Sequence, residues 1–337
     1  MLKQTRSCAA MSKLRKTSLK TASSAAQSSN TTVVQSRGTH TTGGCVPSAS
    51  SGVALNKPLS ASEAPWPAGI ASFMRLPLQR DTKGLGACFV GVPLDIATTN
   101  RSGARFGPRQ IRYESIGIRP HNPATNESPF EDLQVADIGD VGFTMYSLQD
   151  AVKQIRVEFD TIVSEGCIPL VMGGDHSITY PIMQAIANKH GPVAVVHIDA
   201  HTDTADSVWG SKLMHATPFR RMVEDNLIQP QYVYQIGLRG STYEKGAYNW
   251  GIEQGFHVVP ATECWYKSLA PLMEEVRAHM GDRPVYISFD IDAIDPSFCP
   301  GTGTREVGGL TTIQALEIIR GLKGLNLVGC DVVEVAP

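Results

Sequence analysis

Short apolar runs of strand length, alternating with amphipathic helical segments, constrain the fold of this 337-residue chain more than any other feature. The clearest helical segment begins after Ser147, which together with Asp150 resembles a capping box, and its apolar residues recur with a helical period. Strands that are apolar throughout are buried on both faces, which is typical of parallel sheets covered by helices. The sequence therefore predicts an α/β fold with three layers, α/β/α, around a central, mostly parallel sheet. The predicted strands are 87–92, 167–172, 193–198, 232–236, 256–259, 285–289 and 327–335. A further helix is predicted to begin at Gly107-Pro108, and others are predicted over 178–188, 218–225, 269–280 and 312–322.

Acidic and histidine residues follow the predicted strands. They stand in Gly173-Gly-Asp175-His176, in Asp199-Ala-His201-Thr-Asp203 and in Ser288-Phe-Asp290-Ile-Asp292-Ala-Ile-Asp295-Pro296. Alternate residues of an extended segment point to the same side, and the carboxyl ends of parallel strands meet at one edge of a sheet, so these side chains can converge. Four carboxylates packed together would repel one another strongly, whereas two divalent cations would balance them. The sequence therefore predicts a dinuclear metal site.

The charge distribution separates the first 62 residues from the rest of the chain. They carry eight Lys or Arg and no acidic residue, whereas the remainder has 22 basic against 32 acidic residues. A basic, acid-poor segment rich in Ser, Thr and Ala is typical of a mitochondrial transit peptide, and a disordered tail without an address is the alternative. We therefore predict a transit or disordered segment over 1–62, one catalytic domain over 66–337, and location in the mitochondrial matrix.

The same composition argues against several classes of protein. An acidic body is a poor surface for nucleic acid, and no stretch approaches the roughly 20 apolar residues of a membrane span. The seven cysteines include no CxxC pair, which is typical of a reduced compartment. Cys299 follows the second acidic run and could act there as a thiolate ligand or nucleophile.

Several motifs resemble the ureohydrolase family, which comprises arginase, agmatinase and the guanidino acid hydrolases. The three metal signatures of that family match residues 173–176, 199–203 and 288–296, and Gly301-Thr-Gly-Thr304, Gly308-Gly309-Leu310 and Glu334 also fit. The similarity runs from about Ser72 to Pro337. A narrower similarity, to the mitochondrial agmatinase-like branch, is carried by Met74-Arg-Leu-Pro77, by residues 100–108 and by Pro218-Phe-Arg-Arg221.

The resemblance implies a ligand set for two metal ions. One metal would be bound by His176, Asp199, Asp203 and Asp290, and the other by Asp199, His201, Asp290 and Asp292, with Asp199 and Asp290 bridging. Oxygen-rich ligands with one imidazole per metal and no thiolate suit manganese better than zinc, so two Mn²⁺ per chain are expected. The alternative is that these residues form only strand-end turns and ion pairs. Asp175 and Asp295 are expected beside the site, as supporting or turn residues.

The resemblance also implies hydrolysis of a linear guanidino compound, agmatine or a short guanidino acid such as 4-guanidinobutyrate, to urea and the corresponding amine. Glu334 would hold the guanidinium by a charge-assisted pair, and His215 would carry a proton to the leaving amine. Asn100, Arg101 and Arg105 lie in a loop after a strand and could reach the mouth of the pocket. They favour a substrate with a carboxylate tail, and structural ion pairs are the alternative for the two arginines.

Two departures from the family pattern keep other functions open. The chain has His215-Ala216 where the family usually has His-Gly, and alanine would be strained if that position requires a positive φ. It also stops at Pro337, where family members usually continue through a further helix, so exposed apolar sheet surface is expected in a shortened or incomplete member. A non-catalytic or impaired member that binds metal without turnover is the alternative function. A deacetylase on the related fold agrees less well with the paired aspartate runs and with Glu334. Family members assemble as trimers or hexamers, so the resemblance implies a homo-oligomer, whose size the sequence does not fix.

Overall fold

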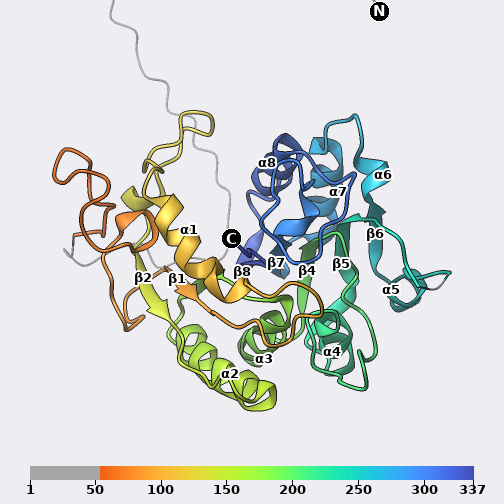
Figure 1. Ribbon diagram of the computed structural model, residues 1–337. Coiled ribbons are helices and arrows are strands. Elements are labelled where there is room, and N and C mark those ends of the chain that lie inside the picture. The colour runs from red at the N-terminus through yellow and green to blue at the C-terminus, as the bar shows by residue number, and fades with distance from the viewer. Residues whose placement is uncertain (1–53, 244) are drawn as a thin grey trace, which may run out of the picture. The chain divides into compact units, whose positions relative to one another are not determined.

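The computed structural model describes residues 54–243 and 245–337, and within them eight strands form one sheet in the order β2-β1-β3-β8-β7-β4-β5-β6 (Figure 1). Every neighbouring pair of strands is parallel, which confirms the predicted sheet. Most of the predicted transit segment, residues 1–53, lies outside the described residues. The strands are β1 Ala87–Gly91, β2 Val135–Asp140, β3 Ile168–Met172, β4 Val193–Ile198, β5 Ile228–Leu238, β6 His257–Pro260, β7 Pro284–Asp290 and β8 Asn326–Val333.

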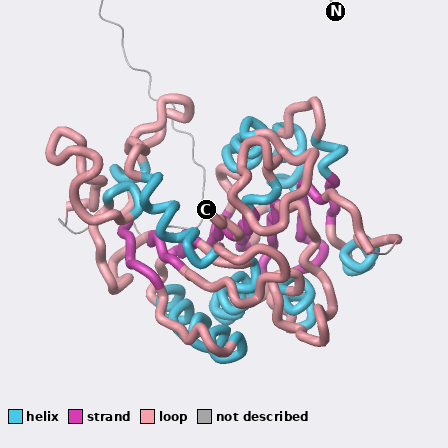
Figure 2. Tube along the Cα trace, viewed as in Figure 1, coloured by secondary structure: helices cyan, strands magenta, loops and turns pink. Residues whose placement is uncertain are grey.

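Helices cover both faces of the sheet. They are α1 Gly107–Ser115, α2 Leu148–Ser164, α3 Thr179–His190, α4 Pro218–Glu224, α5 Asn249–Gln254, α6 Ala261–Cys264, α7 Ala270–Met280 and α8 Thr312–Gly321, with 3₁₀ turns η1 Phe73–Arg75, η2 Ala104–Phe106, η3 Pro129–Glu131, η4 His176–Ile178 and η5 Ile291–Ala293. In Figure 1, α2, α3 and α4 lie on one side of the strands, and α1, α7 and α8 lie on the other. Figure 2 shows the strands as the middle layer between these helices. The predicted three-layer arrangement is therefore confirmed.

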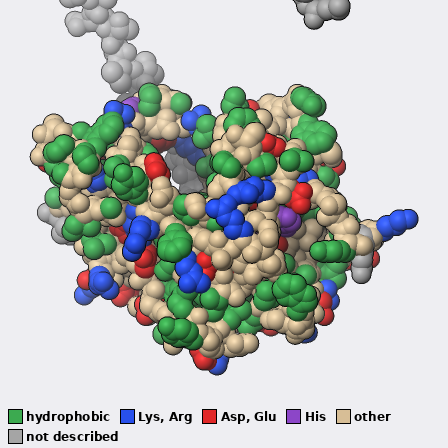
Figure 3. Space-filling model, in the orientation of Figure 1, with side chains coloured by type: hydrophobic (Ala, Val, Ile, Leu, Met, Phe, Trp, Pro, Cys, Tyr) green, Lys and Arg blue, Asp and Glu red, His purple; other side chains and the backbone are tan. Residues whose placement is uncertain are grey.

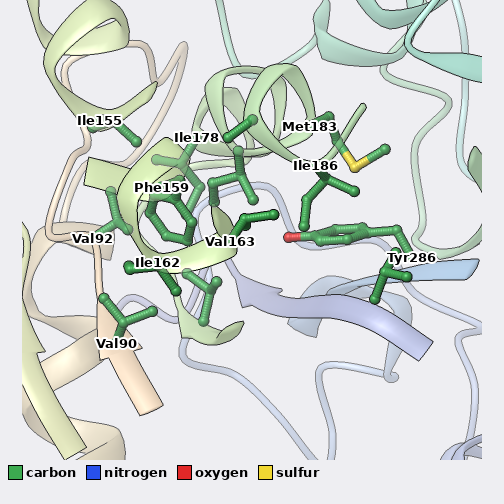
Figure 4. Packing of buried hydrophobic residues seen from close by; sticks show 14 of the residues in the cluster. Val90, Val92, Ile155, Phe159, Ile162, Val163, Ile178, Met183, Ile186 and Tyr286 are labelled. Atoms are coloured by element: carbon green, nitrogen blue, oxygen red, sulfur yellow. The ribbon is translucent and has the colours of Figure 1, made fainter. Parts of the chain in front are cut away.

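The packing of α2 shows why the sequence pattern produces this layer. Ser147 caps the helix, and its side chain accepts a hydrogen bond from the backbone N–H of Asp150 at 3.3 Å. The apolar positions that recur at helical spacing are the buried ones, and Phe159 is fully buried among them. Figure 4 shows Phe159 in one cluster with Val90 of β1 and Ile186 of α3. The periodic face of the helix is thus its contact with the sheet and with the neighbouring helix.

Strand β2 and the short helices α5 and α6 were not predicted from the sequence. In β2, Asp137 and Asp140 interrupt the apolar pattern, which hides the strand. Arg112 of α1 lies against both carboxylates, with Nε 2.8 Å from Asp137 Oδ2 and Nη1 2.5 Å from Asp140 Oδ1. Because a buried carboxylate requires such a partner, this edge strand depends on a contact between residues distant in the sequence.

An apolar cavity of about 720 Å³ lies between α1 and the face of β3 and β8. Its walls include Phe89, Leu170, Cys330, Val332 and Val335. Apolar side chains of the sheet therefore line this cavity.

The surface of the described residues carries mixed charge. On the face in Figure 3, Lys and Arg side chains are interspersed with Asp and Glu, and hydrophobic side chains lie between them. No helix in residues 54–243 and 245–337 combines the length and the apolar character needed to cross a membrane.

Candidate metal centre

The predicted site residues meet at the carboxyl ends of β3, β4, β7 and β8, which are neighbours in the sheet. Asp199 follows the last residue of β4, and Asp290 is the last residue of β7. His176 opens η4 after Gly173 and Gly174. A methyl group on Gly174 would lie 1.8 Å from the carbonyl oxygen of Leu94, so only glycine allows this loop to approach the neighbouring chain. The strand ends therefore deliver all six predicted metal ligands to one place.

His176 faces three carboxylates from two other segments. Its Nδ1 lies 3.1 Å from Asp199 Oδ2, 3.0 Å from Asp203 Oδ2 and 3.3 Å from Asp290 Oδ2. Among the described residues, this Nδ1 is one of a few buried side-chain atoms without a hydrogen-bond partner. Two ligand atoms that share a cation at about 2.1 Å lie roughly 3 Å apart, so the spacing fits a shared cation. We conclude that these four residues are suited to hold one metal ion.

The hydrogen bonds behind His176 fix which ring nitrogen carries a proton. Nε2 lies 2.8 Å from Ser288 Oγ, and this hydroxyl donates to Asp331 Oδ1 at 2.7 Å. A hydroxyl has one proton to donate, so Ser288 must accept from Nε2–H. Tyr286 and Thr179 donate to the other oxygen of Asp331, each at 2.8 Å. The lone pair of Nδ1 is therefore left facing the carboxylates, which is the arrangement of a metal-bound imidazole with an ordered support.

His201 forms the other half of the centre. Its Nδ1 lies 3.0 Å from Asp292 Oδ2 and 3.6 Å from Asp199 Oδ1, and these three residues form a cluster able to hold an ion. Asp199 thus presents Oδ2 to His176 and Oδ1 to His201. A carboxylate with one oxygen toward each half has the geometry of a bridge between two cations.

Burial and mutual repulsion perturb the ionisation of the carboxylates. Burial, followed by Asp292 and Asp199, raises the pKa of Asp290 well above its usual range, and burial and Asp199 raise the pKa of Asp292 to about 6. Burial alone would also raise the pKa of Asp199, but His197, His176 and His201 hold it well below its usual value. Crowded carboxylates favour any bound positive charge, and divalent cations would replace the protons that otherwise neutralise them.

Glu334 and His215 lie against the same centre. Glu334 Oε1 accepts a hydrogen bond from the backbone N–H of His176 at 2.9 Å and lies 3.0 Å from His215 Nδ1. Nε2 of His215 lies 2.7 Å from Thr99 Oγ1 and 3.2 Å from the backbone nitrogen of Thr99. A ring that carries both protons therefore donates from Nδ1 to Glu334 and from Nε2 to the Thr99 hydroxyl. Burial alone would lower the pKa of His215, but Glu334 and then Asp203 and Asp175 raise it to about 9. A protonated imidazole beside a buried carboxylate is suited to donate a proton near neutral pH.

Comparison with known proteins gives the family of this fold and site. A model described as the Arginase family matches residues 85–337. The chain belongs to the arginase family. It is 59% identical to "Agmatinase, mitochondrial" of Gallus gallus, over 84% of this chain and 83% of that one. It is 56% identical to "Guanidino acid hydrolase, mitochondrial" of Homo sapiens, over 84% of this chain and 80% of that one.

A solved structure supports the assignment of the fold. Proclavaminate amidino hydrolase from Streptomyces clavuligerus superposes with a TM-score of 0.78 at 37% identity, covering 81% of this chain and 91% of that one. As a member of the arginase family, the chain is a hydrolase of C–N bonds in linear guanidino compounds. Enzymes of this family use a binuclear metal centre, and the two clusters around Asp199 are the candidates for it here.

The predicted substrate-tail residues differ in their surroundings. The Asn100 side chain donates to the carbonyl oxygen of Gly303 at 3.0 Å and so joins two loops. Arg105 pairs with the buried Asp95 at 2.5 Å, so the structural alternative holds for this arginine. Arg101 is exposed, and its guanidinium makes one long hydrogen bond, 3.5 Å, to the carbonyl oxygen of Pro337. Arg105 is thus held in an ion pair, whereas no ion pair is formed by Arg101 within residues 54–243 and 245–337.

Residues beside the site take supporting positions. Asp175 is buried and accepts from the backbone N–H groups of Ala97 and Ser177. Asp295 accepts from Gly308 and Gly309, and its hydrogen bonds, led by that from Ser297, lower its pKa to about 2. These contacts are those of turn and loop supports.

The structure bears on the departure at Ala216 and on the thiol of Cys299. Ala216 is not among the described residues with a positive φ, so alanine is accommodated there without that strain. Cys299 lines the apolar cavity, and burial raises the pKa of its thiol, which disfavours a thiolate.

Sequence reasoning missed His197, Gln235 and Thr99. His197 lies in the middle of a fully buried apolar strand, and this context is typical of a core residue rather than of a site residue. The available signal was its position two residues before Asp199, since alternate residues of a strand share a face.

Proposed function

We propose that this chain is a binuclear manganese ureohydrolase. His176, Asp199, Asp203 and Asp290 would hold one Mn²⁺, and Asp199, His201, Asp290 and Asp292 would hold the other. The observation that carries this proposal is the unpartnered Nδ1 of His176, buried among three carboxylates. Oxygen ligands with one imidazole for each cation suit Mn²⁺.

The residues around this centre suit the cleavage of a guanidinium. Two bound divalent cations supply an activated water at neutral pH. Glu334 offers a buried carboxylate to the guanidinium, which is a cation that pairs well with a carboxylate. Attack of water on the guanidinium carbon gives a tetrahedral intermediate, which releases urea when the C–N bond to the tail breaks. His215, with its pKa raised to about 9, would supply the proton that the departing amine needs.

We propose a guanidino acid such as 4-guanidinobutyrate, rather than agmatine, as the preferred substrate. Gly303 lies close to the backbone of Arg101, because a methyl on Gly303 would be 2.7 Å from the Arg101 carbonyl oxygen. The same methyl would be 3.9 Å from Glu334 Oε2, so the loop of Asn100 and Arg101 lies next to the guanidinium pocket. An exposed guanidinium at this position would attract the carboxylate end of a guanidino acid and repel the ammonium end of agmatine.

The test is release of urea by the full chain loaded with Mn²⁺, with agmatine, 4-guanidinobutyrate, 3-guanidinopropionate and arginine compared in parallel. Urea from a guanidino acid with the highest kcat/KM supports both proposals. Highest kcat/KM with agmatine, whose other product is the diamine putrescine, contradicts the choice of tail. Two bound Mn²⁺ per chain without urea from any substrate contradicts catalysis and supports the non-catalytic alternative.

We also propose that the protein works in the mitochondrial matrix as a homo-oligomer. The relatives from Gallus gallus and Homo sapiens are named mitochondrial, and residues 1–62 have the composition of a transit peptide. Fusion of residues 1–62 to a fluorescent protein tests the location, and light scattering of the purified full chain tests the assembly. Diffuse cytosolic fluorescence contradicts the first proposal, and a monomeric mass contradicts the second.

A further inference from the structure

His197 is a fully buried histidine directly behind the metal centre. It lies on β4, two residues before Asp199, so both side chains point to the same side of the strand. Its Nε2 is 2.7 Å from Asp199 Oδ2, the oxygen that faces His176. The other oxygen, Oδ1, accepts from the backbone N–H of His201 at 2.6 Å. The carboxylate of Asp199 is therefore held at both oxygens, one by His197 and one by the backbone.

Gln235 on the neighbouring strand β5 determines the tautomer of His197. One atom, Nε2 of the Gln235 amide, lies 2.9 Å from His197 Nδ1 and 2.8 Å from the carbonyl oxygen of Thr202. A carbonyl oxygen only accepts, so the amide must present its N–H₂ group on this side. The second N–H of that group then donates to Nδ1 of His197. Nδ1 is therefore the acceptor of the neutral ring, and the ring proton sits on Nε2, pointed at Asp199.

Aromatic packing fixes the plane of the ring. Phe219 of α4 stacks on His197 with ring centroids 3.8 Å apart and planes 22° apart. The same Phe219 meets the His176 ring edge-on at 5.5 Å. The orientation of His197 is therefore set by one stacked ring and by hydrogen bonds at both nitrogens.

These contacts distinguish a support from a metal ligand. His176, His197 and Asp199 come close enough to form a cluster able to hold an ion. A ligating histidine needs a free lone pair, yet both nitrogens of His197 have partners, whereas Nδ1 of His176 has none. His176 is thus the ligand, and His197 lies behind the carboxylate.

We propose that His197, held by Gln235 with its proton on Nε2, is a positioning residue that keeps Asp199 aligned between the two metal positions. The proposal rests on the metal-ligand set given under Proposed function. It extends the site from the six ligands to a chain of contacts that runs from β5 through β4 to the bridging carboxylate. Supports of this kind typically change metal affinity by about 10- to 100-fold when removed.

The test compares His197→Phe with His197→Gln in the full chain. Phenylalanine keeps the ring that stacks on Phe219 and removes the N–H donor, whereas the amide of glutamine can restore a donor to Asp199. His257→Phe is the matched control. His257 lies on strand β6, away from the centre, and it also stacks on an aromatic ring, that of Tyr234 on β5, with ring centroids 4.5 Å apart. Mn²⁺ affinity is measured by competition with a chelator. Electron paramagnetic resonance of the bound Mn²⁺ reports whether the two ions form a coupled pair.

The expected result is that His197→Phe weakens Mn²⁺ binding about 10- to 100-fold and reduces the coupled-pair signal. His197→Gln should recover most of the affinity, and His257→Phe should leave it unchanged. Wild-type affinity in His197→Phe overturns the proposal, and so does equal loss in the Phe and Gln variants. If the wild-type chain itself does not bind two Mn²⁺, the ligand set fails instead, so the two failures are distinguishable.

A second variant covers the case in which His197→Phe does not fold, as judged by circular dichroism of the metal-free protein. Gln235→Met keeps the volume near His197 and removes the amide that selects the tautomer. An intermediate loss of Mn²⁺ affinity is expected. Unchanged affinity overturns the proposal.

Discussion

The pairing of Glu334 with His215 predicts a specific pH dependence of stability in the metal-free protein. In Glu334→Gln the amide oxygen can still accept from the backbone N–H of His176 and from Nδ1–H of His215. The substitution therefore removes the negative charge and leaves both hydrogen bonds possible. Any change that depends on pH then reports the attraction between the carboxylate and the protonated imidazole.

The size of this effect follows from the pKa of His215. A folded-state pKa of about 9 against 6.5 in the unfolded chain corresponds to about 3 kcal/mol of stability from the protonated form. Since Asp203 and Asp175 also raise this pKa, Glu334 accounts for about 2 kcal/mol. The folded pKa is the higher one, so the contribution is complete below pH 6.5 and is lost as the pH rises through about 9.

The free energy of unfolding is measured by urea denaturation at pH 6 and pH 10, with chelator present, for the wild type and Glu334→Gln. The advantage of the wild type should shrink by about 2 kcal/mol between the two pH values, and it can reverse at pH 10, where Glu334 would be buried without a protonated partner. Glu274→Gln on the exposed side of α7 is the control and should show no such change. An advantage of equal size at both pH values would refute the assigned pairing.

Three further substitutions test other parts of the site. Asp290→Ala removes a carboxylate proposed to bridge both cations. Elemental analysis should therefore find less than one Mn²⁺ per chain, and urea release should be abolished. Retained manganese together with turnover contradicts the ligand set. Ser288→Ala removes the acceptor of His176 Nε2–H and should weaken Mn²⁺ binding about 10- to 100-fold in a chelator competition, and unchanged affinity would show that this support has no role. Arg101→Ala should raise KM for 4-guanidinobutyrate and leave KM for agmatine unchanged or lower, and an equal change for both substrates contradicts recognition of the substrate carboxylate.

Much of the sheet and of the metal centre could be predicted because their signals are local. The strand 193–198 was predicted with the bounds that β4 has, since its burial on both faces makes it apolar throughout. Five of the six candidate metal ligands stand in two short runs of alternating polar residues that end two parallel strands, and His176 follows a third strand. The resemblance to the family then joined these residues into one ligand set. The carboxyl ends of neighbouring parallel strands lie at the same edge of a sheet, so these candidates can be placed together without knowledge of side-chain contacts.

The features that escaped prediction depend on contacts between distant segments. Strand β2 contains Asp137, whose burial requires Arg112 from α1, 25 residues earlier in the chain. His197 was overlooked because its partner Gln235 lies 38 residues later, on the adjacent strand. The arginine that pairs with Asp137 and the amide that selects the tautomer of His197 thus lie in other segments. Sequence patterns therefore indicate the candidate ligands more readily than the residues that lie behind them.

Two of the proposed site residues also have left-handed backbone conformations that are not predictable from their residue types. Asp203 has φ of +50° and Glu334 has φ of +61°, in the left-handed region that favours glycine, and each such conformation costs on the order of 1–3 kcal/mol. Tertiary hydrogen bonds hold both, from Glu334 N–H to Gly174 O at 2.8 Å and from Phe219 N–H to Asp203 O at 3.1 Å. Glycine would relax either position but would remove the carboxylate. The acidic side chains are therefore kept for their chemistry at the centre, against the preference of their own backbone.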